Sequence, residues 1–504
     1  MISQTFDLKK RNILPRWNHF STACLIGDVL PARKREEIVL DRDEIAEKSK
    51  RWVSTKHPID AVDLVGTCIV LNEWEKSVAQ EAAQYIVNHP SDVSITARDM
   101  AALYVSDPDT RSRESFDAIL APPDLHGDIG RLKRHVRSFP HDAIAWADLS
   151  YSYALIGLEK KARNAMRTAY ALSPSNRFLV RSAARCFAHF EDPEEAIWRV
   201  RRSPLRKVDP MVISAEVALS QLLEKSPRNM KIAHTATTSG MFSNRSLSEL
   251  HVALATLESR EGYTRSAKKH AMKSLLDPNE NVLAQIESLN DRVSGFVKDL
   301  EMHSGVLATY EADAQRSYKL GNFNEAYRSA LQWFRYQPFS ARPAVMASFV
   351  ASLFLDNQED AIRVITEAKK AEPNSFLLNN NHVCSLALLN KVEEAADVLS
   401  KIQIGELDDQ RKRIYLATTG LVAYRQGNIA LGEEKYREAI EGFKMKENYR
   451  SLVIATFYQA REIVRIKGSR QSTAMDQVLA LARKYKINDM VSVIEKMCGQ
   501  NGKG

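Results

Sequence analysis

The chain has 504 residues, of which 44% are hydrophobic and 27% are charged, and its formal net charge at pH 7 is +8. This balance excludes a collagen, a mostly disordered chain and a protein composed of membrane spans. Glycine and proline are scarce, at 19 and 17 residues, so the chain has few turn signals and a sheet-rich fold is disfavoured.

Residues 1–42 combine Pro15, Arg16 and Trp17 with a later charged run, and we interpret them as an N-terminal extension without a predicted fold. The chain starts with polar residues, then basic ones, and no long apolar stretch follows. This is not the pattern of a signal peptide. The longest nearly uncharged apolar stretch, 344–355, is shorter than the roughly 18 residues of a membrane span and predicts a buried helix. We therefore expect a cytoplasmic protein without a membrane partner.

Helical pairs are predicted over residues 43–105, and a loose connection over 106–127 follows them. In this connection the chain reads Ser-Asp-Pro-Asp-Thr and then Ala-Pro-Pro-Asp, and such clusters interrupt helices.

A phased helical pattern begins after this connection. From residue 146 the chain reads Trp-x2-Leu-Ser-x2-Tyr, then Gly157, then Ala-x3-Met-x2-Ala from Ala162, and ends at Pro174. The apolar positions recur at helical spacing on two successive segments. Pro140 and Pro174 are 34 residues apart, as are Ala162 and Ala196. A period of this length is typical of stacked helix pairs.

The same pattern returns further along the chain, where Ala326, Ala361 and Ala395 continue it at intervals of 35 and 34 residues. It resembles the tetratricopeptide repeat (TPR), although Ser150 and Met166 stand where that family usually has glycine and an aromatic residue. The resemblance implies an all-α protein, an α–α superhelix built as a solenoid of antiparallel helix pairs. In such an array each pair buries the apolar side of the pair before it.

The repeat pattern divides the rest of the chain. We predict a first TPR block over 128–236, a loop over 237–246 and a second TPR block over 247–444. Capping helices and a frayed tail are predicted over 445–504, where the apolar periodicity continues without the full repeat signature.

The resemblance implies that a partner binds in the concave groove lined by the first helix of each pair. In the repeat after Pro174 that helix carries Arg181, Arg185 and His189, which are spaced by four and form one stripe. Two guanidinium groups on this stripe suit a carboxylate or a phosphate. A stripe that is solvated, or that pairs with acids on a neighbouring helix, is an equally open alternative. Further first-helix candidates are Gln315, Tyr318, Lys319, Asn380, Tyr424 and Arg425.

Positive charge is concentrated in residues 131–207, which we call the basic belt. It contains 16 Lys or Arg against 7 Asp or Glu, so it favours an acidic partner. Nucleic-acid recognition usually adds exposed stacking aromatics, whereas Trp146, Tyr153 and Trp198 occupy or neighbour expected core positions. An acidic protein or peptide is therefore the favoured partner, and nucleic acid bound through the belt is the alternative.

Catalytic and metal-binding motifs are missing from the sequence. No H-E-x-x-H, Walker loop, G-x-G-x-x-G or G-x-S-x-G motif occurs, and the five cysteines form no C-x-x-C pair. We expect no metal, no cofactor and no enzymatic activity. The sequence thus predicts a non-catalytic adaptor, scaffold or regulatory subunit that controls a separately encoded activity, with self-association left open.

Overall fold

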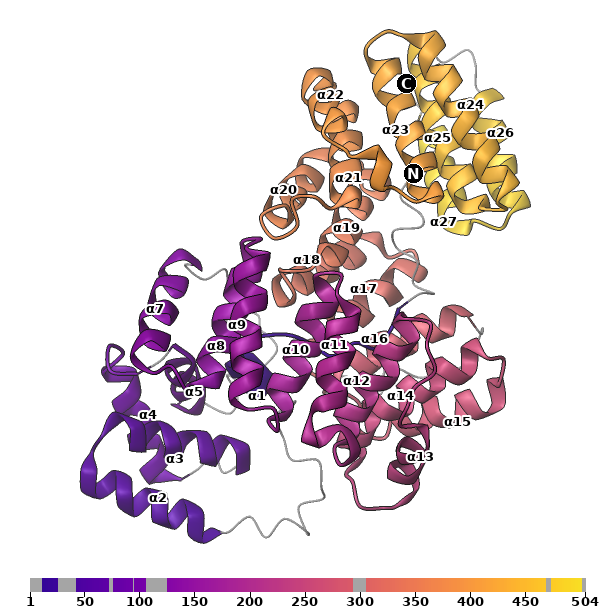
Figure 1. Cartoon of the computed structure of the whole chain (residues 1–504). Helices are drawn as coiled ribbons and strands as arrows, with labels where there is room; N and C mark the ends of the chain where they lie inside the picture. Colours follow the sequence, from indigo (N-terminus) through magenta and orange to yellow (C-terminus); the bar gives the residue numbers. More distant parts are fainter. Residues whose placement is uncertain are drawn as a thin grey trace. The chain divides into compact units, whose positions relative to one another are not determined.

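The computed structural model describes residues 11–25, 42–71, 76–93, 95–105, 125–292, 305–467 and 473–500. All regular elements in these ranges are helices (Figure 1). The chain divides into two compact units. Among the described residues, the N-terminal unit comprises 11–312 with 335–337, and the C-terminal unit comprises 313–334 with 338–500.

The helices of the N-terminal unit are α1 (Phe20–Leu25), α2 (Arg42–Thr55), α3 (Pro58–Leu71), α4 (Ser77–Asn88), α5 (Ile95–Val105), α7 (Leu125–Ser138), α8 (Ala143–Leu155), α9 (Glu159–Leu172), α10 (Arg177–His189), α11 (Pro193–Arg202), the 3₁₀ helix η3 (Pro204–Lys207), α12 (Pro210–Leu222), α13 (Met230–Thr238), α14 (Asn244–Arg260), α15 (Thr264–Ser274) and α16 (Glu280–Arg292). The boundary between the two units falls inside helix α17 (Tyr310–Lys319). Ala312 belongs to the N-terminal unit and Asp313 to the C-terminal unit.

The C-terminal unit continues with α18 (Phe323–Tyr336), α19 (Ala341–Phe349), the π-helix η5 (Val350–Phe354), α20 (Gln358–Ala368), α21 (Phe376–Leu388), α22 (Val392–Ser400), the 3₁₀ helix η6 (Ile404–Glu406), α23 (Asp409–Arg425), α24 (Ile429–Met445), α25 (Tyr449–Lys467), α26 (Thr473–Lys484) and α27 (Asn488–Gln500). The buried helix predicted at 344–355 is confirmed by α19 and η5, whose apolar residues are buried.

Consecutive helices form antiparallel pairs. Helices α8 and α9, α10 and α11, and α14 and α15 are each joined by a short turn and pack along each other. The first helices of successive pairs also pack side by side, in the order α8, α10, α12, α14 and α16 (Figure 1). This is the architecture of a TPR-like helical solenoid, so the predicted fold class is confirmed.

Local sequence explains where these helices begin and turn. The side chains of Asp142, Asn176, Asp192 and Asp209 each accept hydrogen bonds from backbone N–H groups in the first turn of the helix that follows. Such N-caps satisfy donors that the helix itself leaves unpaired. Gly157, predicted at the turn between paired helices, has a φ of 69°, a conformation that side-chain-bearing residues disfavour.

The repeat's small residues allow close helix crossings. Ser150, which departs from the usual glycine, is fully buried and donates its hydroxyl to the carbonyl of Ala162, 2.7 Å away. In the C-terminal unit Gly420 lies against the ring of Tyr436, and Gly432 lies against the ring of Tyr424. Each of these two glycines therefore makes room for a tyrosine of the paired helix.

Adding a methyl group at Gly432 tests this close packing. Its Cβ would lie 2.7 Å from Cδ2 and 2.9 Å from Cγ of Tyr424, too close for atoms near the base of a buried ring. Overpacking costs about 1–3 kcal/mol, and the better helix propensity of alanine offsets up to about 1 kcal/mol. We expect Gly432→Ala to lower the free energy of unfolding by about 1–2 kcal/mol in urea denaturation.

The matched control for that prediction is Gly405→Ala, because a Cβ at Gly405 meets no atom within 4 Å. Its free energy of unfolding is expected to match the wild type. A Gly432→Ala protein as stable as wild type would contradict the packing described above.

The predicted segment boundaries differ in detail from the helices. Residues 106–124 of the expected loose connection lie outside the described residues, and α7 begins at Leu125. Within the expected loop 237–246, only residues 239–243 separate α13 from α14. The predicted capping segment contains α25, α26 and α27. None of the helices in the described part of the chain combines the length and apolarity that crossing a bilayer requires.

Candidate functional site

The first helices of the N-terminal unit form a surface that another part of the same chain occupies. We call the surface made by α8, α10, α12, α14, α16 and the start of α17 the first-helix face. Residues 11–19 run along it without helical structure, as the extended indigo segment of Figure 1 shows. Because Pro15 steers the residue before it out of the helical region, the sequence itself favours this extended form.

Arg11 is buried at the α16 and α17 end of this face. Its guanidinium donates to both carboxylate oxygens of Glu311 at 2.9 Å, to Gln285 Oε1 at 2.8 Å and to Asn281 Oδ1 at 2.6 Å. The side chains of Arg11 and Glu311 are only 3% and 2% exposed. The planar guanidinium matches a fork of acceptors here, as arginine does at specific recognition sites.

Arg16 contacts two carboxylates on the same face. Its Nε donates to Glu280 Oε1 at 3.1 Å and its Nη2 donates to Glu311 Oε2 at 2.8 Å. Burial acts to lower the pKa of Arg16, but the carboxylates of Glu311 and Glu280 outweigh it and hold that pKa above its ordinary value. Tyr336 donates its hydroxyl to Glu280 and accepts a hydrogen bond from Asn18 Nδ2, both at 3.1 Å.

Two amide side chains of α16 form hydrogen bonds both with the backbone of the segment and with the guanidinium of Arg11. Asn281 Nδ2 donates to the carbonyl of Leu14 at 3.0 Å. Gln285 Nε2 donates to the carbonyl of Arg11, also at 3.0 Å. Each amide thus accepts from the guanidinium with its oxygen and holds the backbone with its nitrogen.

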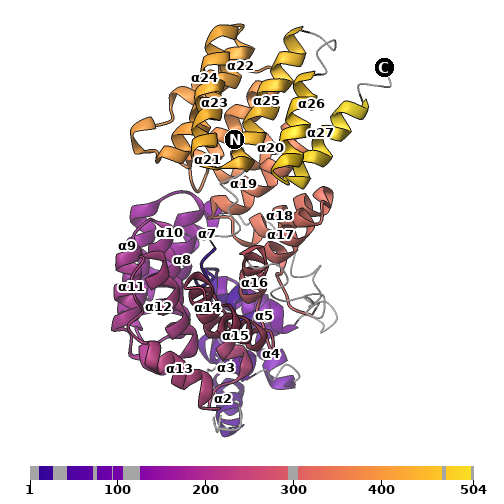
Figure 2. The same ribbon diagram turned by 90° about the vertical axis from the view of Figure 1, so that its right-hand side faces the viewer.

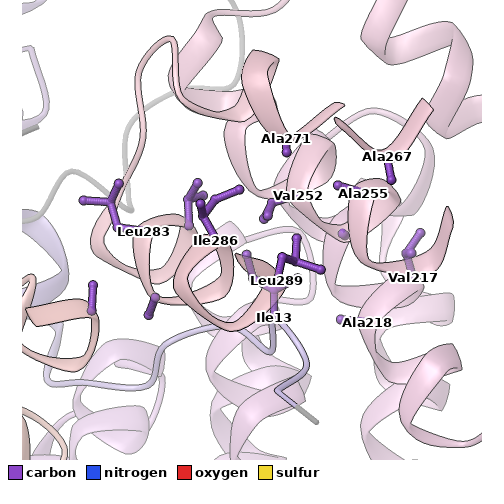
Figure 3. Close-up of a cluster of buried hydrophobic side chains, with 14 residues drawn as sticks. Ile13, Val217, Ala218, Val252, Ala255, Ala267, Ala271, Leu283, Ile286 and Leu289 are labelled. Carbon is purple, nitrogen blue, oxygen red and sulfur yellow. The ribbon is translucent and has the colours of Figure 1, made fainter. Parts of the chain in front are cut away.

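Apolar residues of the segment complete the contact. Trp17 is 1% exposed and lies edge-on to Tyr151 of α8, with ring centroids 5.5 Å apart. Ile13 joins the core cluster formed mainly by α14, α15 and α16, where it lies beside Leu289 (Figure 3). Phe20, at the start of α1, packs against Phe178 of α10, with ring centroids 5.1 Å apart. Residues 11–23 of the expected N-terminal extension are therefore buried or partly buried against the array.

The predicted stripe Arg181, Arg185 and His189 lies on α10, next to this segment. Arg181 donates to both carboxylate oxygens of Glu249 on α14, at 2.7 and 3.0 Å. Burial would raise the pKa of Glu249, but Arg181 outweighs it and holds that pKa at about 2. The ring of His189 is 6.3 Å from that of Trp17.

These contacts define the state of the stripe in the free chain. Burial lowers the pKa of His189 to about 3, and the charge of Arg185 adds to the effect, so His189 is neutral at pH 7. Arg185 is partly buried. The carboxylate that Arg181 holds belongs to the chain itself, so a partner gains that guanidinium only by breaking a buried ion pair.

The remaining predicted binding residues are spread over the C-terminal unit. Gln315, Asn380 and Tyr424 are buried, and Asn380 accepts a hydrogen bond from Thr418 at 2.6 Å. Arg425 donates to Glu462 of α25 at 2.6 Å. These side chains therefore serve contacts inside the unit.

Tyr318 also contacts other helices of the unit, whereas Lys319 differs from the other five candidates. Tyr318 donates to Asp489 of α27 at 2.7 Å and also contacts Arg450 of α25, which donates to Asp489 at 2.8 Å. Lys319 is exposed. The structure thus does not gather the six C-terminal candidates on one surface.

Many cations of the basic belt are paired with acids of the N-terminal unit. Arg167 and Arg199 both donate to Glu195, and Arg163 pairs with Asp192. The carboxylate of Glu195 is partly exposed; burial would raise its pKa, but the hydrogen bonds from Arg167 and Arg199 lower it to about 2. Arg177 with Asp209 and Arg201 with Glu216 form further pairs.

Trp198 of the belt lies on the surface, which corrects its expected place near the core. Its side chain is 47% exposed because α11 buries its neighbours Ile197 and Val200 instead. The guanidinium carbons of Arg202 and Arg199 lie 4.7 and 5.5 Å from the indole. Arg202 and Arg228 are themselves exposed and line an open basin with Trp198, and Glu194 and Glu195 of α11 also line it. We call Trp198, Arg202 and Arg228 the tryptophan basin.

Titratable clusters elsewhere are small. No group of three or more His, Cys, Asp or Glu suited to a metal ion occurs among the described residues. His251 and His270 face each other with their Nδ1 atoms 2.9 Å apart. Burial lowers the pKa of His251 to about 3 and that of His270 to about 4. Both imidazoles are therefore neutral at pH 7, and one Nδ1–H donates to the Nδ1 of the other ring.

No protein-family model and no curated protein matches this chain. It is similar to the crystal structure of the APC/C hetero-tetramer Cut9–Hcn1, with 13% identity and a TM-score of 0.39 over 90% of this chain and 86% of that chain. It is also similar to yeast Tom70, with 15% identity and a TM-score of 0.31 over 77% of this chain and 97% of that chain.

A third similar structure is a monomeric mutant of IFIT1 with Gppp-AAAA, with 11% identity and a TM-score of 0.32 over 95% of this chain and 98% of that chain. Figure 2 shows the stacked helices of each unit from a second direction. Likenesses of this degree assign no function to the chain.

Proposed function

We propose that this protein is a non-catalytic protein-binding adaptor, scaffold or regulatory subunit that assembles or controls a separately encoded activity. One observation carries the proposal, namely that the first-helix face of the N-terminal unit holds an extended segment through side chains of several successive helices. Helical-repeat arrays typically bind their partners on extended surfaces of this kind. The buried free thiols Cys68, Cys186 and Cys384 support a reducing, cytoplasmic setting.

The tryptophan basin supports an acidic protein partner on the outside of the basic belt. Tryptophan and arginine are the residue types most enriched among interface hot spots, and Trp198, Arg202 and Arg228 combine them on an exposed surface. A partner surface with an acidic side chain that pairs with the guanidinium groups and an apolar side chain that packs on the indole satisfies both. We therefore propose that the acidic partner binds here, while Arg181 stays in its internal ion pair.

Capture of partners from native lysate by the tagged full chain tests the adaptor proposal. It is run with and without nuclease and at two salt concentrations. The proposal predicts a stoichiometric protein that survives nuclease. Nucleic acid that is lost on nuclease treatment, and whose binding weakens steeply and log-linearly with salt, would instead establish the belt as a nucleic-acid surface and overturn the proposal.

Changing the tryptophan basin tests where the acidic partner binds. Truncation of a tryptophan or arginine hot spot costs about 2 kcal/mol or more. We therefore expect the double variant Trp198→Ala with Arg202→Glu to bind the captured protein at least about tenfold more weakly. The matched control is Arg328→Glu, which reverses a charge that is 77% exposed in the C-terminal unit and should leave binding unchanged. Equal affinity for wild type and double variant would move the acidic-partner site elsewhere.

A further inference from the structure

We propose that the first-helix face is a receptor for an extended segment with two arginines and an aromatic residue, and that residues 11–20 are a resident ligand which such a segment of a partner protein displaces. This inference deepens the proposed function and rests on it. The segment that defines the chemistry reads Arg-Asn-Ile-Leu-Pro-Arg-Trp-Asn-His-Phe.

The face has fixed acceptors for two guanidinium groups. Glu311 contacts both Arg11 and Arg16, and Glu280 contacts Arg16. The side chains of Glu280 and Glu311 are 1% and 2% exposed. A buried carboxylate that loses its counter-charge is strongly disfavoured. If residues 11–20 leave the face, its buried carboxylates are therefore stabilised more by a guanidinium of another segment than by water.

The same face has contacts that fit any extended chain. Asn281 and Gln285 donate to the carbonyls of Leu14 and Arg11, groups that every residue supplies. The aromatic pocket at Trp17 is formed by side chains of α8 and α10, including Tyr151 and His189. Specificity then comes from the four residues that separate the two arginines and from the aromatic residue that follows the second arginine.

The contacts of residues 11–19 allow a competing segment to replace them. They contribute no helix or strand. Arg11 and Arg16 bind acceptors more than 250 residues away in the chain, and Ile13 and Trp17 pack against apolar and aromatic side chains of the face. Such a segment releases as one local unit, without unwinding a helix of the array. A competitor's apparent affinity is then its intrinsic affinity reduced by the fraction of molecules whose face is open.

Charge distinguishes this receptor from the tryptophan basin. The face offers the carboxylates of Glu280 and Glu311 to a basic segment, whereas Arg202 and Arg228 offer cations to an acidic surface. The two sites therefore bind different parts of one partner, or two different partners.

Titration of the full chain with a fluorescent peptide of residues 11–20 tests the inference. Peptide binding is measured by anisotropy for wild type, for Asn18→Ala, and for the double variant Arg11→Ala with Arg16→Ala. Asn18→Ala removes only the neutral hydrogen bond to Tyr336, so it loosens the resident segment without leaving a buried charge unpaired.

The expected result is saturable binding that tightens in that order, several-fold for Asn18→Ala and at least tenfold for the double variant. A peptide with alanine in place of both arginines should bind at least tenfold more weakly to every form. The wild-type peptide should also raise the melting temperature of the double variant, because it returns both guanidinium groups in trans. Replacing Glu311 with glutamine should weaken the peptide's binding.

Several results would overturn the inference. No saturable binding to wild type or to folded Asn18→Ala would mean that residues 11–20 are a permanent part of the core, whether or not the double variant folds. A concentration-dependent dimer that the peptide dissociates would assign the face to a second copy of this chain instead. A lysate partner that depends on the tryptophan basin would still support the proposed function in either case, so the two failures are distinguishable.

Discussion

Replacing Arg181 with alanine is expected to lower the free energy of unfolding by about 3–5 kcal/mol at pH 7, because it leaves the carboxylate of Glu249 buried without its counter-charge. The side chains of Arg181 and Glu249 are 3% and 1% exposed, so water cannot replace the lost ion pair. Urea denaturation of the full chain measures the loss.

The pH dependence of this loss has a defined sign. In the wild type the pKa of Glu249 falls from an ordinary 4.5 to about 2, because Arg181 outweighs the opposing effect of burial. Its stabilisation is therefore present above pH 4.5 and is lost as the pH falls toward 2. In Arg181→Ala the largest effect that opposes burial is gone, so the pKa of Glu249 rises from its wild-type value, although Asn279 and Asn281 still donate to the carboxylate. The difference in stability between wild type and variant should shrink between pH 7 and pH 4.

Two further proteins control this experiment. The double variant Arg181→Met with Glu249→Met should recover part of the stability, since apolar side chains of similar volume often replace a buried ion pair without loss. The recovery is incomplete because the buried amide of Asn279 loses Glu249 as its acceptor. Arg363→Ala breaks an ion pair with Asp360 whose arginine side chain is 70% exposed, and should cost about 0–1 kcal/mol. A loss of under about 1 kcal/mol for Arg181→Ala itself would contradict the role given to the pair.

Replacing Arg450 with alanine is expected to destabilise the C-terminal unit by about 2–3 kcal/mol, because charge-assisted hydrogen bonds are worth about that much. Arg450 of α25 contacts Asp489 of α27 and Tyr318 of α17. Burial acts to lower the pKa of Arg450, but Tyr318 and Asp489 outweigh it and raise that pKa. For Asp489, burial acts to raise the pKa, but the hydrogen bond from Arg450 outweighs it and lowers that pKa below its ordinary 3.8.

Hydrogen exchange of the amides in α27 measures where the effect of Arg450→Ala falls. The expected result is a loss of protection in α27, with little change in α21. Arg450→Lys should recover only part of the protection, because an ammonium lacks the guanidinium fork. As a control, Arg483→Ala breaks a pair with Glu495 whose side chains are 61% and 49% exposed. Equal protection of α27 in Arg450→Ala and wild type would show that the contact does not hold that helix.

The helical array was predictable from sequence because its determinants are local. Apolar and small residues recur at a fixed period, as Ala162 and Ala196 do, and the resemblance carried by them implied the pairing that the structure confirms. Turn glycines and capping residues act within a few positions of themselves. Such signals can be recognised in the sequence without knowing which helices contact each other.

The candidate site was less predictable because its determinants are distant in sequence. Arg181 meets Glu249 across 68 residues, and Arg11 meets Glu311 across 300. Residues 11–19 have no periodicity, so nothing in them pointed to the array. The signal that was available is composition, since Ile13, Leu14 and Trp17 lie close together and apolar side chains are costly to leave exposed to water. Trp198 was misplaced because one residue along α11 changes a buried position into an exposed one.

Hydrogen exchange of the intact wild-type chain over residues 11–19 is the most direct test of the central claim that the first-helix face binds an extended segment. The account predicts protection above that of an unstructured peptide at Leu14, whose N–H donates to the carbonyl of Asn12, exchange through a local opening that needs less free energy than global unfolding, and loss of the protection in Glu311→Gln. Exchange at the rate of an unstructured peptide would contradict the claim, because residues 11–19 would then not be bound to the first-helix face.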